Sequence, residues 1–160
     1  MGLFSKPKNA AQAPEEAPKA APAVEENPGA SYALDESYVT YAAESKARIL
    51  GVSWDTIDTV GVVSAACACE MAAGVKRISG AHWGVSATGL AGPDGGTDDL
   101  PVGTVFIGVA YEKGAQAYEC HFAGDRMQIR LQAVQRALEL LAENMEKQSP
   151  EKAACGGNNE

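Results

Sequence analysis

Large apolar side chains recur at three- and four-residue steps near the end of the chain. After Asp125 they form one stripe, made of Leu131, Val134, Leu138, Leu141 and Met145. This spacing matches the period of an α-helix that is apolar on one side and polar on the other. The sequence therefore predicts a terminal helix that begins near Asp125 and turns this stripe toward a core.

Shorter helix and strand patterns precede that helix. Stretches of strand-forming side chains predict strands at 37–41, 83–88, 102–111 and 117–122. Helices are predicted at 44–50, closed by Gly51, at 53–59, capped by Ser53, and at 64–78, capped by Ser64. A chain that mixes strands and helices in this way predicts a layered α/β fold with a mixed sheet.

Composition divides the chain into three parts. Residues 1–27 contain seven alanines, four prolines, three lysines and four glutamates, with almost no large apolar side chain after Phe4. Such a segment cannot bury enough apolar surface to offset its ordering entropy, so we expect a disordered arm. We expect one folded domain at 28–147 and a flexible polar tail at 148–160.

Net charge and cysteine spacing argue against several kinds of partner and binding site. The 160 residues carry a net charge of −8, which argues against a nucleic acid or an anionic membrane as partner. No apolar run reaches the length of about 18 residues that a membrane span needs, so a cytoplasmic protein is expected. The four cysteines lack the spacing of zinc ligands, and we therefore expect free thiols with neither metal nor cofactor.

A glycine-rich stretch follows the predicted strand at 83–88. It includes Thr88, Gly89, Gly92, Gly95, Gly96 and Thr97. Glycine at this density lets the backbone approach a ligand closely, and successive N–H groups can converge on an anion. The alternative is a flexible connection between two strands.

Two further candidates come from positioned side chains. Arg126 lies in the first turn of the terminal helix, where backbone N–H groups and a fixed cation could bind an anion; alternatively, it lies back over the helix surface. Tyr41, at the end of a predicted strand, and Lys46, in a predicted helix, could meet over a cleft and position or deprotonate a hydroxyl. A solvated lysine is the alternative for that pair.

These motifs, in this order, resemble the CinA C-terminal domain family, whose stand-alone form is nicotinamide-nucleotide amidohydrolase. The resemblance runs from Pro28 to about Leu141. It is carried by Pro28-Gly29-Ala30-Ser31, Val39-Thr40-Tyr41, Lys46, Leu50-Gly51-Val52, Gly61-Val62-Val63-Ser64, Glu70-Met71-Ala72, Gly74, the stretch from Thr88 to Thr97, Pro101-Val102-Gly103-Thr104-Val105, Phe122-Ala123-Gly124-Asp125-Arg126 and Arg130.

The resemblance implies an α/β/α layered domain and a reaction. The family hydrolyses the amide of nicotinamide mononucleotide to nicotinic acid mononucleotide and ammonia, with a serine nucleophile and without a metal. Tyr41 and Lys46 would activate that serine, and Arg126 would complete a pocket lined by Thr88 and the glycine loop through Thr97. A pyridine nucleotide partner and a homo-oligomer are implied as well.

The chain departs from the family pattern at three places. The family's first strand and helix carry Ala-Glu-Ser-Cys-Thr-Gly-Gly with the nucleophile, and no such segment occurs in these 160 residues. Ala42-Ala43 replaces the usual Ser-Asn, and Leu100 replaces a common lysine. We therefore expect an impaired or inactive amidohydrolase-like protein. The alternatives are a non-catalytic nucleotide-binding or interaction module, an enzyme that takes its serine from a partner chain, and a sequence whose true start is hidden. A purely structural protein with no ligand is a further alternative.

Overall fold

A computed structural model describes residues 32–148 of the chain. Its elements, in chain order, are α1 (Ala43–Ser45), the π-helix η3 (Lys46–Leu50), α2 (Trp54–Thr59), α3 (Ala65–Ser79), β1 (Gly84–Gly89), β2 (Thr104–Tyr111), β3 (Gly114–His121) and α4 (Arg126–Gln148). The predicted arm at 1–27 lies outside the described residues, as does the predicted tail beyond Gln148.

The three described strands form one antiparallel sheet in the order β1-β2-β3. The α/β class is confirmed, but the mixed sheet is corrected, since both described pairings are antiparallel. A parallel pair needs a long crossover connection. Here β1 runs into β2 through a loop at 90–103, and β2 runs into β3 through the turn at Glu112-Lys113, so each strand returns beside the one before it.

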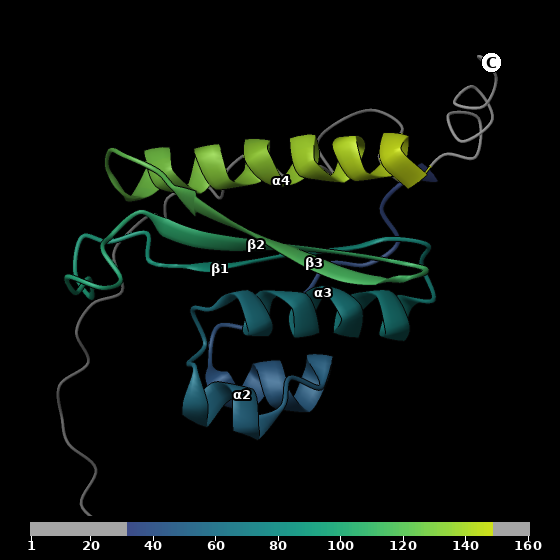
Figure 1. Cartoon of the computed structure of the whole chain (residues 1–160), viewed down its shortest axis with the longest axis horizontal. Coiled ribbons are helices and arrows are strands. Elements are labelled where there is room, and N and C mark those ends of the chain that lie inside the picture. Colours follow the sequence, from purple (N-terminus) through teal and green to yellow (C-terminus); the bar gives the residue numbers. More distant parts are fainter. Residues whose placement is uncertain (1–31, 149–160) are drawn as a thin grey trace, which may run out of the picture.

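The elements stack in three layers, with α3 on one face of the sheet and α4 on the other (Figure 1). The shorter helices lie beyond α3, so this side of the molecule is thicker. Small residues allow α3 to approach the sheet closely. Ser86 of β1 donates a hydrogen bond to the carbonyl of Ala68 in α3 at 2.6 Å.

Two apolar cores hold these layers together. One lies between the sheet and α4 and is built around Val105, Ile107, Val109, Ile129 and Leu140. The other lies between α3 and the short helices and is built around Leu50, Val52, Cys67 and Met71. Burial of both cores fixes the positions of η3, β1 and the head of α4, which carry Lys46, Thr88 with Gly89, and Arg126.

The terminal helix is confirmed, but the face it buries is not the predicted one. Ile129 and Leu140 are buried against the sheet. Four of the five stripe residues remain exposed to between 38% and 48%, namely Leu131, Val134, Leu138 and Met145. The buried row also contains Ala133 and Ala137, whose small side chains let α4 lie close to the sheet. Periodicity identifies an apolar face but does not reveal which of two faces is covered.

The predicted strand at 37–41 is wrong. These residues belong to no ladder of the described sheet, and Val39 and Tyr41 are largely exposed, whereas Thr40 is buried. Strand-forming side chains stabilise a strand only where a neighbour offers hydrogen bonds and packing. The local signals for helix ends are confirmed, because Ser53 and Ser64 cap α2 and α3.

Candidate functional site

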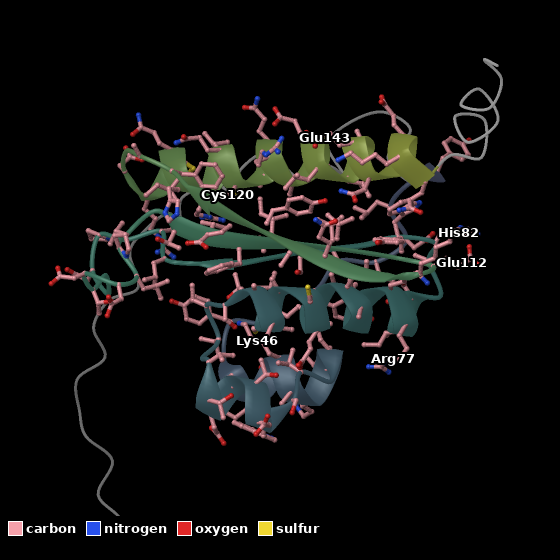
Figure 2. All side chains as sticks on the ribbon, viewed as in Figure 1. Lys46, Arg77, His82, Glu112, Cys120 and Glu143 are labelled. Atoms are coloured by element: carbon pink, nitrogen blue, oxygen red, sulfur yellow. The ribbon has the colours of Figure 1, made fainter. Side chains whose placement is uncertain are left out.

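Lys46 is a buried cation at the start of η3. Its side chain is 6% exposed, and its Nζ donates hydrogen bonds to the carbonyls of Thr40 at 2.6 Å and Tyr41 at 3.4 Å. Figure 2 places it between α3 and the short helices. Tyr41 thus meets Lys46 through its backbone carbonyl, while its ring is 87% exposed. The predicted pair is adjacent, but the contact does not involve the tyrosine hydroxyl.

Cys67 is a second polar group in this region, and our sequence reasoning did not include it in the site. It lies in the first turn of α3 and is fully buried. Burial raises the pKa of its thiol, and the nearby ammonium of Lys46 opposes part of that rise. The sequence did place Cys67 in the first turn of this helix, because Ser64 is recognisable as the N-cap. It did not show that Cys67 lies near Lys46, because these two residues are far apart in the sequence.

Thr88, at the end of β1, uses its hydroxyl to hold the backbone. Its Oγ1 donates to the carbonyl of Val62 at 2.6 Å, just before α3 begins. The side chain is 7% exposed. This hydrogen bond fixes the start of the glycine-rich stretch against the N-terminal end of α3, the same end that carries Cys67.

The stretch that follows is a packed loop whose glycines have identifiable roles. A Cβ on Gly89 would lie 2.6 Å from the carbonyl oxygen of Thr104. Gly92 has φ +72°, and a Cβ there would lie 2.6 Å from the side chain of Val102, while at Gly96 it would lie 2.8 Å from the backbone nitrogen of the same residue. Close packing against Val102 therefore requires glycine at two positions of the loop.

The far side of the loop closes in a turn. Thr97 donates its backbone N–H to the carbonyl of Leu100 at 3.0 Å, and its Oγ1 accepts the N–H of Leu100 at 3.1 Å. Gly95, with φ +95°, is exposed at the tip. A connection held at both ends is more ordered than the flexible alternative that the composition left open.

Arg126 ties this loop to the head of α4. Its Nη1 donates to the carbonyl of Gly92 at 2.9 Å. The helix end itself is already capped, because the Asp125 carboxylate accepts the N–H of Gln128 at 2.8 Å and Gln128 Oε1 accepts the N–H of Asp125 at 2.8 Å. A ligand anion would therefore depend on the guanidinium more than on free N–H groups of the helix.

Two hollows are described at the surface, and their linings do not include the predicted site residues. One, of about 450 Å³, lies beside η3 and the start of α2 and is lined by Glu44, Ala47, Arg48, Gly51, Val52, Ser53 and Trp54. The other, of about 490 Å³, is lined by Ala123, Gly124, Gln128, Leu131 and Gln132. The predicted residues instead fall into two groups, Tyr41 with Lys46 and the glycine loop with Arg126, while Thr88 joins the loop to the start of α3.

Within residues 32–148, no three His, Cys, Asp or Glu side chains gather closely enough to hold a metal ion. None of the helices in the same range combines the length and the apolar character needed to cross a bilayer.

The three layers, with a glycine-rich loop anchored by Arg126 at the head of α4, define an α/β/α domain. The chain belongs to the CinA C-terminal domain family, whose family model matches residues 19–145.

Relatives with sequence similarity carry competence-related names. A putative competence-damage inducible protein of Clostridium novyi (strain NT) is 43% identical over 114 residues, which are 71% of this chain and 28% of that protein. A CinA-like protein of Anaeromyxobacter sp. (strain K) is 46% identical over the same length, with the same coverage. The chain thus spans about 28% of the length of these curated relatives.

Solved structures of the family share the fold. The competence/damage inducible protein CihA from Agrobacterium tumefaciens matches with a TM-score of 0.72 and 37% identity, over 75% of this chain and 74% of that one. A CinA superfamily protein from Enterobacter cloacae matches with a TM-score of 0.70 and 30% identity, over 75% and 72%. About a quarter of each of these chains has no counterpart in the match.

Proposed function

We propose that this domain binds a pyridine mononucleotide of the nicotinamide mononucleotide type and is related to enzymes that hydrolyse its amide to nicotinic acid mononucleotide and ammonia. We propose further that the 160-residue chain alone carries out this reaction slowly or not at all. The observation that carries the binding proposal is the contact between Arg126 and the carbonyl of Gly92.

A phosphate is the ligand group that this contact suits. One guanidinium nitrogen of Arg126 is used to hold the loop at Gly92, so the side chain is fixed beside a loop whose glycines Gly95 and Gly96 are exposed. The residue remains exposed and therefore open to a ligand. The remaining N–H donors of an arginine can form two parallel hydrogen bonds with a phosphate, which is stronger and more specific than a lysine contact.

The surroundings of Lys46 support the proposal that the chain hydrolyses the amide slowly or not at all. Amide hydrolysis of the family type needs an activated nucleophile next to its base. Lys46 is engaged by two carbonyls, and Ala42-Ala43 supplies no hydroxyl beside it. Cys67 is a poor substitute, because it is buried and its pKa is raised by burial, whereas a reactive cysteine needs an exposed thiolate.

Titration calorimetry tests the binding proposal. We expect the full chain to bind nicotinamide mononucleotide more tightly than its dephosphorylated riboside. Arg126→Ala should weaken mononucleotide binding by about ten- to a hundredfold, since a charge-assisted hydrogen bond contributes about 1.5–3 kcal/mol. Arg126→Lys should restore part of the affinity. Equal binding of the two ligands would place the anion site elsewhere, and no binding below millimolar concentration would remove the ligand proposal.

A coupled ammonia assay tests the activity proposal separately. We expect no turnover at an ordinary enzymatic rate from the purified chain. Release of ammonia at about one turnover per second or faster, abolished by Lys46→Ala, would contradict that expectation. Binding without turnover would support the alternative of a non-catalytic nucleotide-binding module. The exposed stripe on α4 favours an interaction role for such a module.

A further inference from the structure

A hollow of about 450 Å³ lies at the surface of the short helices, which Figure 1 shows on the far side of α3 from the sheet. Small-molecule sites commonly have volumes of about 300–1,000 Å³. This η3 hollow is lined by Glu44, Ala47, Arg48, Gly51, Val52, Ser53 and Trp54. Its lining shares no residue with the glycine loop or with Arg126, so a ligand in it would be separate from the proposed nucleotide.

Trp54 is the largest side chain of this lining, and it is 51% exposed. It is the first residue of α2, whose first turn is fixed because Ser53 Oγ accepts the N–H of Asp55 at 3.1 Å. Leaving so much apolar surface in water is unfavourable. An aromatic ring on an ordered helix offers a ligand a large and rigid contact surface, and tryptophan is enriched among the residues that dominate binding.

Two side chains of α3 hold the backbone between η3 and α2 in place. Glu70 accepts the N–H of Ser53 at 2.6 Å, and Arg77 Nη2 donates to the carbonyl of Leu50 at 3.2 Å. Figure 2 shows Arg77 on the side of α3 that faces away from the sheet. Gly51 has φ +76°, and a Cβ there would lie 2.9 Å from Arg77 Nη2. The hollow is therefore formed before a ligand enters, which reduces the ordering cost of binding.

Two opposite charges line the η3 hollow without pairing. Glu44 and Arg48 are both exposed, and they lie four residues apart on consecutive helical segments. Side chains with this spacing and these charges often form an ion pair on a helix. Within residues 32–148, however, neither of the two side chains has an ion pair or a hydrogen bond. A carboxylate and a guanidinium are therefore both open to a ligand in the same hollow.

The charges and the apolar surface together define the class of ligand. A simple anion would be attracted by Arg48 but repelled by Glu44, and a simple amine would meet the reverse. A ligand that satisfies both residues carries a carboxylate and an ammonium. Contact with Trp54 and Val52 requires an apolar group in addition. An α-amino acid with a large apolar side chain combines these three groups in one small molecule.

We propose that the η3 hollow binds a free α-amino acid with an aromatic or large aliphatic side chain. Arg48 holds the carboxylate of the ligand, for which a guanidinium can supply two parallel hydrogen bonds. Glu44 accepts hydrogen bonds from the ammonium. The ring of Trp54 packs on the apolar side chain of the ligand. This binding does not depend on amide hydrolysis or on nucleotide binding.

An NMR titration of the nitrogen-15-labelled full chain with L-phenylalanine tests this proposal. The indole N–H signal of Trp54 should shift saturably, with a Kd of about a few millimolar or below, because the ligand is small and the hollow is open. Trp83 is the second tryptophan of the chain, and its ring lies 5.8 Å from that of Tyr111, centroid to centroid. Its indole signal is an internal control that should not shift, and Trp83→Phe assigns the two signals.

Two analogues and two variants separate the roles of the charges. 3-Phenylpropionate lacks the ammonium and phenethylamine lacks the carboxylate, so each should bind about two- to fivefold more weakly than phenylalanine. Arg48→Gln should weaken phenylalanine binding by a similar factor without weakening phenethylamine binding. Glu44→Gln should weaken phenylalanine binding without weakening 3-phenylpropionate binding. Both positions are exposed, and Glu112→Gln and Lys113→Gln are matched controls in the exposed turn between β2 and β3 that should bind phenylalanine as the wild type does.

Several outcomes would overturn the proposal. Absence of a saturable Trp54 shift at tens of millimolar phenylalanine would remove the site. Equal affinity of the wild type for phenylalanine and for both analogues would show that the two charges do not select the ligand. A shift of the Trp83 signal in place of the Trp54 signal would locate binding elsewhere. Because these results come from the wild-type chain, the proposal remains testable even if a variant fails to fold.

Discussion

Gly108, in the central strand, provides the sharpest test of how α3 lies on the sheet. A Cβ at this position would lie 2.2 Å from the carbonyl oxygen of Ala68, 2.6 Å from its carbonyl carbon and 2.7 Å from Ser86 Oγ. The first two atoms are helix backbone, and the third is hydrogen-bonded to the first at 2.6 Å. Gly108→Ala must therefore shift the helix or displace that hydrogen bond.

The expected cost follows from these contacts. Overpacking of a close-packed interior costs about 1–3 kcal/mol. Loss of the hydrogen bond between Ser86 and Ala68 adds about 0.5–1.5 kcal/mol. Replacing glycine by alanine restricts the unfolded chain, and this effect raises the free energy of unfolding by about 0.4–1 kcal/mol. We therefore expect Gly108→Ala to lower the free energy of unfolding by about 2 kcal/mol.

Urea unfolding of the full chain, followed by far-ultraviolet circular dichroism, measures this loss. The midpoint should fall while the slope with urea stays constant, because the same surface is exposed on unfolding. Gly61→Asn is the control, since Gly61 has φ +85° with open space around it and asparagine tolerates that backbone. The free energy of unfolding of Gly61→Asn should lie within about 1 kcal/mol of the wild-type value. A Gly108→Ala variant as stable as the wild type would show that α3 does not lie this close to β2.

Two other predictions concern the layer of α3. Glu70 accepts hydrogen bonds from the N–H of Ser53 at 2.6 Å and from Thr56 Oγ1 at 2.5 Å, so Glu70→Ala should cost about 1–2 kcal/mol in urea unfolding, whereas exposed Glu44→Ala should cost little. Burial raises the pKa of the Cys67 thiol in the folded state, so the unfolded chain loses its proton first and stability should fall as the pH rises above about 8.5. Urea midpoints between pH 7 and about 10 measure this fall, and Cys67→Ala should reduce it; an unchanged slope in that variant would contradict the assignment.

Sequence reasoning succeeded where the structure depends on neighbours along the chain. Ser53 and Ser64 cap their helices through N–H groups two and three residues ahead, and Gly51 ends η3 with φ +76°. Each of these interactions is contained within a few residues. A local pattern therefore suffices to predict it.

Sequence patterns failed where contacts between segments far apart in the chain determine which side chains are buried or hydrogen-bonded. The buried side of α4 depends on which row fits the sheet, and the row with Ala133 and Ala137 packs closer than the stripe with Leu138. The contact from Arg126 to Gly92 joins residues 34 apart, and that from Thr88 to Val62 joins residues 26 apart. The sequence was enough to select Arg126 and Thr88 as site residues, but only the fold shows which backbone carbonyl each of them contacts.

The order of the strands has a consequence for how the chain folds during synthesis. Each described strand pairs with its neighbour in sequence, so the β2–β3 ladder closes the turn at Glu112-Lys113 and the β1–β2 ladder closes the loop at 90–103. Contacts between segments this close in sequence favour rapid folding. The helix α3, which covers one face, comes directly before β1. All of these elements leave the ribosome before α4 does. The sheet and α3 can therefore assemble as an early unit, with the face that α4 will cover still exposed until that 23-residue helix emerges.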